Sequence, residues 1–506
     1  MAVLINFTAD KYQRDPYIEK FSKYGPVYFG YYKKNNEVFF DGTNLNFKIT
    51  LPSHINNDSF IEYAENLNKD TEEIYSHLRK SIFDRYCYYL TRASGSHLGG
   101  IYEYLYYFRL HIRAAVRFLD DNKIDFMFMA TPSMGFDNVL YEVSKLKKIN
   151  YICLFQVHNN RFFWTQNWQD MGKFSTSLPI FPTYKVITNK KIFDPYYMVR
   201  VQKKNYKEGS FRRAFNGAYS YLKDLIASFY YAFNFNKLII RDNLKKEFTK
   251  PSTWLIQGNK SRFLAYKYIY NSSNKLRITL EKKYSIDYKD SNKILFFKKV
   301  QPEATESFTN SFYDDQLLAI DKLLNLSPKG TIIYIKEHPD ESKNDPMARA
   351  NFWYSVSKRK NLIVVPSDYP TKDIIKEFNI IATFDGSVGW EAIRNLKKVI
   401  CFGRPWYLSM PGVFDANEII NFNEIINFKW TLDDINNSFT KLTKKMGIGY
   451  VCDLENGRVN SSDEFTDYKS FSFEEKKEKL ANNDLVLADS FYKIYLNIKK
   501  IQECKN

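Results

Sequence analysis

Short apolar runs separated by helix-length segments dominate the carboxyl-terminal half of the chain. β-Branched and aromatic residues cluster at Thr331–Ile335, Leu362–Val365, Asn379–Phe384 and Lys398–Phe402, and each run stops at a polar residue or a Gly/Pro break. This alternation predicts a parallel sheet wound with helices. In such a sheet the ligand site lies beyond the carboxyl ends of the strands, so we expect the polar residues that follow these runs to converge on one edge.

The amino-terminal half shows the same alternation. A helix is predicted over Ile101–Leu119, and strands over Asp125–Ala130 and Tyr151–Gln156 flank a further helix-length segment. This βαβ pattern predicts a second Rossmann-like unit, with the loops Thr131–Asn138 and Val157–Trp168 at its ligand edge.

The remaining segments link and extend these two units. Between about residues 181 and 290 the chain becomes basic and aromatic, which suits either helices packed on their own domain or a stretch lying on an anionic membrane surface. Apolar positions at helical spacing from Leu485 to Ile498 predict a terminal helix that packs back on the first domain. The predicted fold class is therefore α/β, with two Rossmann-like domains facing a cleft. The predicted limits are residues 1–290, residues 291–474 and a helical segment over residues 475–506.

Composition supports a folded chain with anionic partners. The 506 residues are 44% hydrophobic and 17% aromatic, which excludes a disordered chain and favours two domains. Lys and Arg (74) exceed Asp and Glu (57), giving a net charge of +17. This balance either serves solubility or favours an anionic small molecule and an anionic membrane face. The sequence contains no nucleic-acid-binding signature, so nucleic acid is not an expected partner.

Cysteine usage and hydropathy bear on the compartment. The five cysteines are scattered and lack CxxC spacing, which suits a reducing compartment and argues against a disulfide framework or a zinc site. The first residues lack a basic leader, and no apolar run reaches the roughly 18 residues of a membrane span. We expect a cytoplasmic protein, with peripheral contact at the inner face of the cytoplasmic membrane as one option.

The first candidate for chemistry is the segment KEHP. His338 follows a predicted strand, where a histidine can donate a hydrogen bond to a phosphate or titrate as an acid or base. The alternative is a turn histidine made rigid by Pro339. Lys336 has the same side-chain parity as His338 and would add positive charge.

The second candidate is the segment FDGSVGWEA. Gly386 and Gly389 would let the backbone approach a ligand closely, and the N–H groups of residues 387–390 would be the unpaired donors of a helix start. Such a site suits a phosphate or pyrophosphate, although the same residues also make any tight strand-to-helix turn. Glu391 can accept hydrogen bonds from ribose hydroxyls or merely complement the helix dipole.

Further candidates lie in loops that would face the cleft. Glu303 follows the strand ILFFKKV, in a position that can equally begin a helix. Asp137 and His97 can serve as a base for an acceptor hydroxyl. Arg161 can hold an anionic substrate, and Trp164 offers a flat face for a sugar ring. Each of these residues also has an ordinary structural explanation.

Four segments occur in a recognisable order: KILFFKKVQPEATES, GTIIYIKEHP, ATFDGSVGWEAI and KKVICFGRPWY. Over about residues 293–412 this set resembles the capsule polysaccharide biosynthesis family, which includes transferases of 3-deoxy-manno-octulosonic acid (Kdo). The resemblance implies a two-domain GT-B fold, with the nucleotide-sugar donor in the carboxyl-terminal domain and the acceptor in the amino-terminal one. The chain departs from the family pattern at Phe384-Asp385, beside the expected donor phosphates.

The resemblance also assigns roles by position. His338 and Pro339 match the family's HP motif, whose histidine is expected to contact the donor phosphate. The glycine-rich segment matches the phosphate loop and a ribose-contacting glutamate, and Glu303 matches a glutamate whose role is open. The residues expected to bind the nucleotide sugar are Lys336, His338, Pro339, Asp385, Gly386, Ser387, Val388, Gly389, Glu391 and Arg404.

The leading hypothesis is an inverting, metal-independent glycosyltransferase. It would move a CMP-linked acidic sugar such as Kdo to a lipid-linked or polysaccharide acceptor of a capsule or other surface polymer, with no cofactor beyond this co-substrate. Asp137, His338 and Glu303 would act in catalysis, and His97, Arg161 and Trp164 would bind the acceptor.

Two alternatives stay open. The first is a CDP-alcohol-dependent transferase of glycerophosphate or ribitol phosphate, which ranks lower because such enzymes carry Asp-Tyr-Ser-Ser where this chain has Asp-Gly-Ser-Val. The second is a non-catalytic scaffold or regulator of polysaccharide export.

Overall fold

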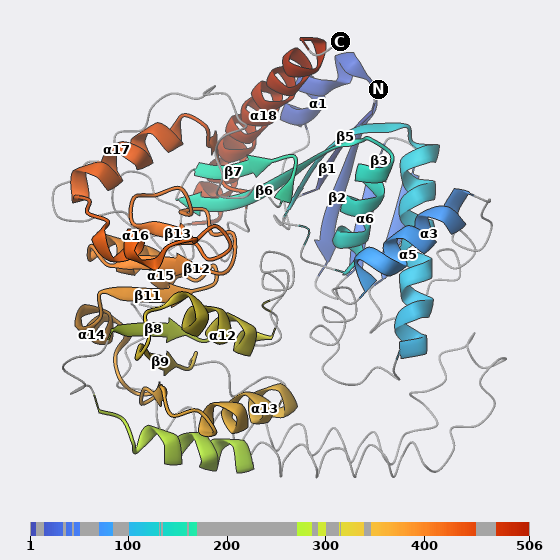
Figure 1. Ribbon diagram of the computed structural model, residues 1–506. Helices are drawn as coiled ribbons and strands as arrows, with labels where there is room; N and C mark the ends of the chain where they lie inside the picture. The colour runs from blue at the N-terminus through green and yellow to red at the C-terminus, as the bar shows by residue number, and fades with distance from the viewer. Residues whose placement is uncertain are drawn as a thin grey trace.

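In the computed structural model the chain forms two α/β units, each built on its own sheet (Figure 1). Among the described residues, no helix is long and apolar enough to cross a membrane. Most of the basic, aromatic region predicted between residues 181 and 290 lies outside the described residues. The structure describes residues 2–6, 15–33, 37–42, 45–50, 70–83, 101–130, 132, 135–158, 161–168, 271–285, 292–299, 313, 315–338, 346–451 and 472–504.

The first unit contains an eight-stranded mixed sheet in the order β14-β7-β6-β5-β1-β2-β3-β4, here called sheet A. Its strands β2, β1, β5 and β6 run parallel, and β3, β4, β7 and β14 join antiparallel. The strand bounds are β1 (Ala2–Asn6), β2 (Val27–Lys33), β3 (Glu37–Gly42), β4 (Leu45–Thr50), β5 (Ile124–Ala130), β6 (Asn150–His158), β7 (Arg161–Thr165) and β14 (Gly447–Ile448).

Helices cover both faces of sheet A because its central strands are apolar on both sides. Successive side chains of a strand point to opposite faces. Met127 and Met129 of β5 pack with one group of helices, and Phe126 and Phe128 pack with another. The first group comprises α3 (Asp70–Ser81), α5 (Ile101–Asp121) and α6 (Gly135–Leu146), and the second comprises α1 (Asp15–Phe21) and α18 (Phe473–Glu503).

The second unit contains a wholly parallel six-stranded sheet in the order β10-β9-β8-β11-β12-β13, here called sheet B. Its strands are β8 (Lys293–Phe297), β9 (Ile332–Lys336), β10 (Leu362–Val364), β11 (Ile380–Thr383), β12 (Lys398–Cys401) and β13 (Val413–Asp415). The strands β9, β10, β11 and β12 confirm the four predicted runs. Counted within this unit, the order is 3-2-1-4-5-6, so the strand order reverses between β8 and β11.

The helices of the second unit are α12 (Gln316–Leu326), α13 (Pro346–Ser357), α14 (Thr371–Ile374), α15 (Ser387–Arg394), α16 (Phe422–Asn427) and α17 (Leu432–Thr443). Of these, α12 to α15 connect successive parallel strands, and α16 and α17 follow β13; β10 and β11 are buried at every position. The predicted α/β class with two Rossmann-like units is confirmed. The cleft between the units and the domain limits stay predictions.

After α17 the chain returns to the first unit. The Ser490 hydroxyl accepts from the Ile448 N–H at 3.0 Å and donates to the Ile448 carbonyl at 2.7 Å, and the Asn483 amide bonds the Tyr450 backbone in the same reciprocal way at 2.8 and 3.1 Å. The return segment is therefore held between β7 and α18. The two-residue strand β14 has no pattern of its own, so the sequence does not predict it.

Helix α18 packs back on the first unit, as its apolar face predicts (Figure 1). A capping box between Ser472 and Glu475 starts the helix. Its inner face meets sheet A and α1, where Phe491 stacks on Phe128 with ring centroids 4.6 Å apart. The helix therefore belongs to the core of the first unit.

Replacing Phe491 with Ala tests this role of α18. Phe491 is fully buried, so the Phe491→Ala variant should lose about 3–5 kcal/mol of unfolding free energy, because it leaves a cavity between α18 and sheet A. The matched control Leu496→Ala, on the exposed face of the same helix, should lose less than about 1 kcal/mol. Urea denaturation measures both. Equal, small losses would show that α18 is not part of the core.

Candidate functional site

Polar residues at the ends of four neighbouring strands meet at the carboxyl-terminal edge of sheet B. His338 follows β9, Lys299 follows β8, Asp385 follows β11 and Arg404 follows β12, and these strands are adjacent in the order β9-β8-β11-β12. The predicted convergence of polar residues on one edge is therefore confirmed by the topology. In open parallel sheets this edge is where ligands bind, at the point where the strand order reverses.

Lys299 and Asp385 form an ion pair at that point of reversal. The register of β8 and β11 pairs Phe296 with Ala382, and its continuation brings Lys299 opposite Asp385. The side chains are only 11% and 13% exposed. Gln316 holds the backbone of Lys299, because its amide accepts from the Lys299 N–H and donates to the Lys299 carbonyl, both at 2.9 Å.

The sequence prediction missed Lys299 because it reads as an ordinary solvent-facing lysine after the strand ILFF. The only signal in the sequence is its distance from the strand end. Lys299 lies two residues beyond β8, as Asp385 lies two residues beyond β11. That signal becomes meaningful only when β8 and β11 are known to be neighbours.

Glu337, in the middle of KEHP, is the centre of a buried ionic network. Arg349 donates to both of its carboxylate oxygens, at 2.8 and 2.9 Å, and Trp353 donates its indole N–H at 3.1 Å. Arg277 adds a second guanidinium at 3.1 Å. Arg349 and Trp353 come from α13 and Arg277 from the helical residues 271–281, so one carboxylate joins three elements.

Lys336 is held by the loop that follows β10. Its ammonium donates to the carbonyls of Pro366 and Ser367, each at 3.1 Å. Burial lowers the pKa of Lys336 to about 8, so most of the population remains charged at neutral pH. Its positive charge therefore lies beneath the same edge, fixed by backbone oxygens. His338, by contrast, is exposed to solvent at the end of the segment.

The glycine-rich segment forms the turn from β11 into α15, as predicted. Gly386 is the N-cap residue, and the Tyr407 hydroxyl donates to its carbonyl. A Cβ at Gly389 would lie 2.8 Å from Cζ of Tyr407, so Gly389 permits the close approach of this ring. Val388 and Glu391 are half-buried on the same helix. The N–H groups of Ser387 and Val388, in the first turn, are donors that an α-helix leaves unpaired.

Arg404 is engaged by the neighbouring strand. Its guanidinium pairs with Asp415, the last residue of β13. Asp415 also accepts from the N–H of Asn417 at 3.0 Å, which fixes the carboxylate. Arg404 therefore reaches the predicted edge with its charge directed toward Asp415.

The predicted residues of the first unit are placed differently. The structure corrects the expected loop Val157–Trp168, because its aromatic run forms β7 and pairs with β6. Trp164 is only 7% exposed and donates its indole N–H to the Lys445 carbonyl at 2.9 Å, so it closes the core rather than offering a face to a sugar. Arg161 is buried in the same strand.

Asp137 lies in the first turn of α6, after the carboxyl end of β5, and is 2% exposed. The structure thus places it at the carboxyl-terminal edge of the parallel strands of sheet A, with its side chain buried. Three predicted residues, His97, Glu303 and Pro339, lie outside the described residues.

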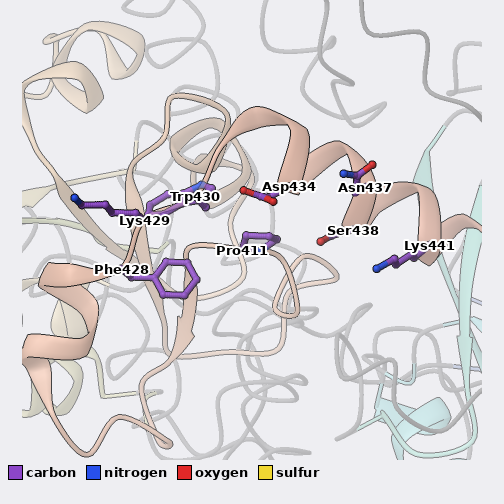
Figure 2. A pocket seen from close by; sticks show the side chains of 8 residues that line it. All are labelled: Pro411, Phe428, Lys429, Trp430, Asp434, Asn437, Ser438 and Lys441. Atoms are coloured by element: carbon purple, nitrogen blue, oxygen red, sulfur yellow. The ribbon is translucent and has the colours of Figure 1, made fainter.

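A cavity of about 430 Å³ lies elsewhere in the second unit, between α17 and the segment 428–430 (Figure 2). Phe428 and Trp430 form part of its lining, with Lys429 and Lys441 at its two ends (Figure 2). Pro411, which also lines it, precedes β13 and so lies at the amino-terminal edge of the parallel sheet B. This cavity therefore lies at the edge opposite Asp385. The described residues contain no group of three or more His, Cys, Asp or Glu side chains placed to hold a metal ion.

Residues 305–438 match the family model described as capsule polysaccharide biosynthesis protein. The match confirms the resemblance for this part of the chain, which includes His338, the turn into α15 and Arg404. No curated protein matches the sequence.

Several solved structures are similar to parts of the chain. KpsC beta Kdo 2,7 transferase from Thermosulfurimonas dismutans is 19% identical over 39% of this chain and 59% of that chain, with a TM-score of 0.22. KpsC beta Kdo 2,4 transferase from the same organism is 11% identical over 64% of this chain and 84% of that chain, with a TM-score of 0.24. UDP-GlcNAc 2-epimerase from Methanocaldococcus jannaschii is 11% identical over 95% of this chain and 99% of that chain, with a TM-score of 0.22.

The chain thus spans less than two thirds of the first of these structures. TM-scores this low support no inference about substrate or mechanism.

Replacing Glu337 with Gln tests the ionic network. The Glu337→Gln variant removes the counter-charge of the buried Arg349 guanidinium and leaves Arg277 paired only with Glu281 among the described residues, so we expect a loss of about 3–5 kcal/mol of unfolding free energy. The matched control is Asp321→Asn, which breaks the more exposed pair with Arg359 and should cost about 0–1 kcal/mol. Chemical denaturation measures both. A loss for Glu337→Gln no larger than that of the control would contradict the network's structural role.

Proposed function

We propose that the chain is a glycosyltransferase that binds a nucleotide-activated sugar at the carboxyl-terminal edge of sheet B. The observation that carries the proposal is the position of His338, Asp385 and Arg404. They follow β9, β11 and β12 of the parallel sheet, on both sides of the point where the strand order reverses, and lie within the residues that match the capsule polysaccharide biosynthesis model. Fold alone does not determine function, and the proposal therefore depends on the charged groups at this edge.

These groups suit a departing nucleotide phosphate. Transfer of the sugar breaks its bond to the phosphate, so negative charge grows on the phosphate oxygen. Lys336 supplies a fixed positive charge, His338 an exposed donor, and the first N–H groups of α15 further donors. Preorganised donors and charges of this kind are often the largest single term in catalysis.

The proposed donor is a CMP-linked acidic sugar of the Kdo type, and the proposed acceptor is a lipid-linked or polysaccharide chain of a capsule at the cytoplasmic membrane face. The resemblance of the sequence segments supports this choice, together with the family match and the basic charge balance. Transfer is proposed to be inverting and metal-independent, with the acceptor hydroxyl attacking the sugar from the face opposite the phosphate.

Asp137 is the proposed base for that hydroxyl. It begins α6 at the carboxyl end of β5, the edge of sheet A that corresponds to the donor edge of sheet B. A carboxylate in this position can take the proton as the hydroxyl attacks. Glu303, matched only by the resemblance, is proposed to act beside the donor.

The identity of the donor nucleotide is tested by thermal denaturation with CMP, CDP, UDP and GDP. A ligand that binds only the native state raises the melting temperature, and a concentration of about 100 Kd adds about 2.7 kcal/mol to the stability. We expect CMP to stabilise the protein most. Stabilisation by UDP alone would exclude the Kdo-type donor, a clear preference for CDP would favour an alcohol-phosphate transferase, and no stabilisation by any nucleotide would favour a scaffold.

Two variants separate donor binding from proton transfer. His338→Ala should reduce both nucleotide binding and sugar transfer, because its side chain is proposed to contact the donor phosphate. Asp137→Asn should keep nucleotide binding and lower the transfer rate by about 100-fold or more, the usual scale of general-base catalysis. Calorimetry with CMP and a transfer assay measure the two properties. Full transfer by His338→Ala in a folded protein would refute the donor assignment, and full transfer by Asp137→Asn would refute the base.

A further inference from the structure

The pair formed by Lys299 and Asp385 occupies the place where a phosphate would be expected. It lies between β8 and β11, where the strand order of sheet B reverses, and Asp385 immediately precedes the N-cap of α15. A carboxylate here presents negative charge to a lysine and to the start of a helix. These are the two kinds of group that bind phosphate in many nucleotide sites.

From these observations we infer that Asp385 is an internal stand-in for phosphate: it holds Lys299 in the empty site, and the donor's phosphate displaces it and takes over the Lys299 ammonium. This inference rests on the proposed function, because it assigns Lys299 to the phosphate subsite of that same donor site.

The chemistry of the two side chains suits an exchange of partners. A lysine carries a compact charge on a flexible four-carbon stem, so its ammonium can move between two acceptors. The backbone of Lys299 is fixed on both sides by Gln316, so only the side chain needs to move. The pair is mostly buried, at 11% and 13% exposure, so its charges are poorly screened and compete strongly with an entering anion.

The nearby pair of Arg404 and Asp415 lacks this character. Asp415 ends β13 and is fixed by the N–H of Asn417, and its side chain is only 4% exposed. Arg404 presents a planar guanidinium rather than a point charge. Of the two pairs, the Lys299–Asp385 pair is therefore the one suited to exchanging its carboxylate for a phosphate.

The inference predicts an unusual sign. Removing the negative charge with Asp385→Asn should strengthen binding of CMP and of inorganic pyrophosphate by roughly tenfold, since the side chain at position 385 no longer competes with these ligands for the Lys299 ammonium. Lys299→Met should weaken binding by at least as much. The matched control Asp321→Asn makes the same charge change at a separate, more exposed ion pair and should leave the affinity unchanged. Isothermal titration calorimetry measures all of these affinities on the full chain.

A double-mutant cycle shows whether Asp385 acts through Lys299. In the Lys299→Met background, adding Asp385→Asn should give little of the tenfold gain, because the cation for which it competes is absent. If Asp385→Asn increases the affinity equally in the wild-type and Lys299→Met backgrounds, the assignment of Lys299 is overturned. The gain would then come from the loss of direct repulsion between Asp385 and the bound anion. Circular dichroism and the melting temperature confirm that each variant is folded. The single variant Lys299→Met leaves the Asp385 carboxylate without its counter-charge and can fail to fold for that reason. The double variant removes both charges and therefore remains testable if the single variant does not fold.

The outcomes separate this inference from the proposed function. Nucleotide binding that is equal or weaker in Asp385→Asn overturns the inference and leaves the glycosyltransferase proposal standing. Tighter pyrophosphate binding in Asp385→Asn without binding of any nucleotide supports the exchange of Asp385 for a phosphate but refutes both a nucleotide donor and the assignment of Lys299 to its phosphate subsite. Failure of both probes to bind the wild type and Asp385→Asn overturns the inference.

Discussion

The ionic network around the Glu337 carboxylate is the interaction on which the carboxyl-terminal edge of sheet B depends. A buried carboxylate is costly unless it is paired and hydrogen-bonded. Here two guanidinium groups and an indole N–H surround it, and they come from α13 and from the helical residues 271–281. The strand end of β9 is thereby fixed between these elements. Because Lys336 and His338 flank Glu337 in the chain, the network also sets where these two residues emerge.

The two charge clusters at this edge differ in how firmly they are built. Arg349 meets both oxygens of Glu337 in a bidentate fork, which fixes direction as well as distance. In the other cluster the single ammonium of Lys299 pairs with the Asp385 carboxylate, and both side chains are more exposed than those of Arg349 and Glu337. The first arrangement resists rearrangement, and the second permits it. A site that must bind and release a phosphate needs both: a rigid frame and an exchangeable charge.

Much of the fold could be predicted from the sequence because it follows from local patterns. The apolar runs of sheet B and the apolar face of α18 have the periods of buried strands and of a helix packed on one side. The partners of Glu337 could not be predicted, because Arg277 and Arg349 lie in other elements and no local pattern connects them with KEHP. Lys299 escaped prediction for a related reason, since its meaning depends on which strands are neighbours.

The candidate residues divide in the same way. Lys336, His338 and the segment DGSVG kept their predicted place, because a strand end in a parallel sheet fixes the edge at which a residue lies. The role of a glycine or a tryptophan depends instead on tertiary contacts. Gly389 makes room for the Tyr407 ring, and Trp164 closes the core against the returning chain. Trp164 was assigned to a ligand from the sequence because its contact with the Lys445 carbonyl comes from a residue far away in the chain.

Asp385 also bears on selectivity. An empty site with an unpaired lysine beside a helix start would attract any small anion in the cell, since the dipole and the ammonium act together. A built-in carboxylate sets a threshold, because an entering ligand must outcompete a mostly buried ion pair at close range. A phosphate group can meet this threshold through its greater charge and its three acceptor oxygens, whereas a simple carboxylate offers no advantage over Asp385. Discrimination of this kind comes from disfavouring the wrong ligand as much as from contacts to the right one.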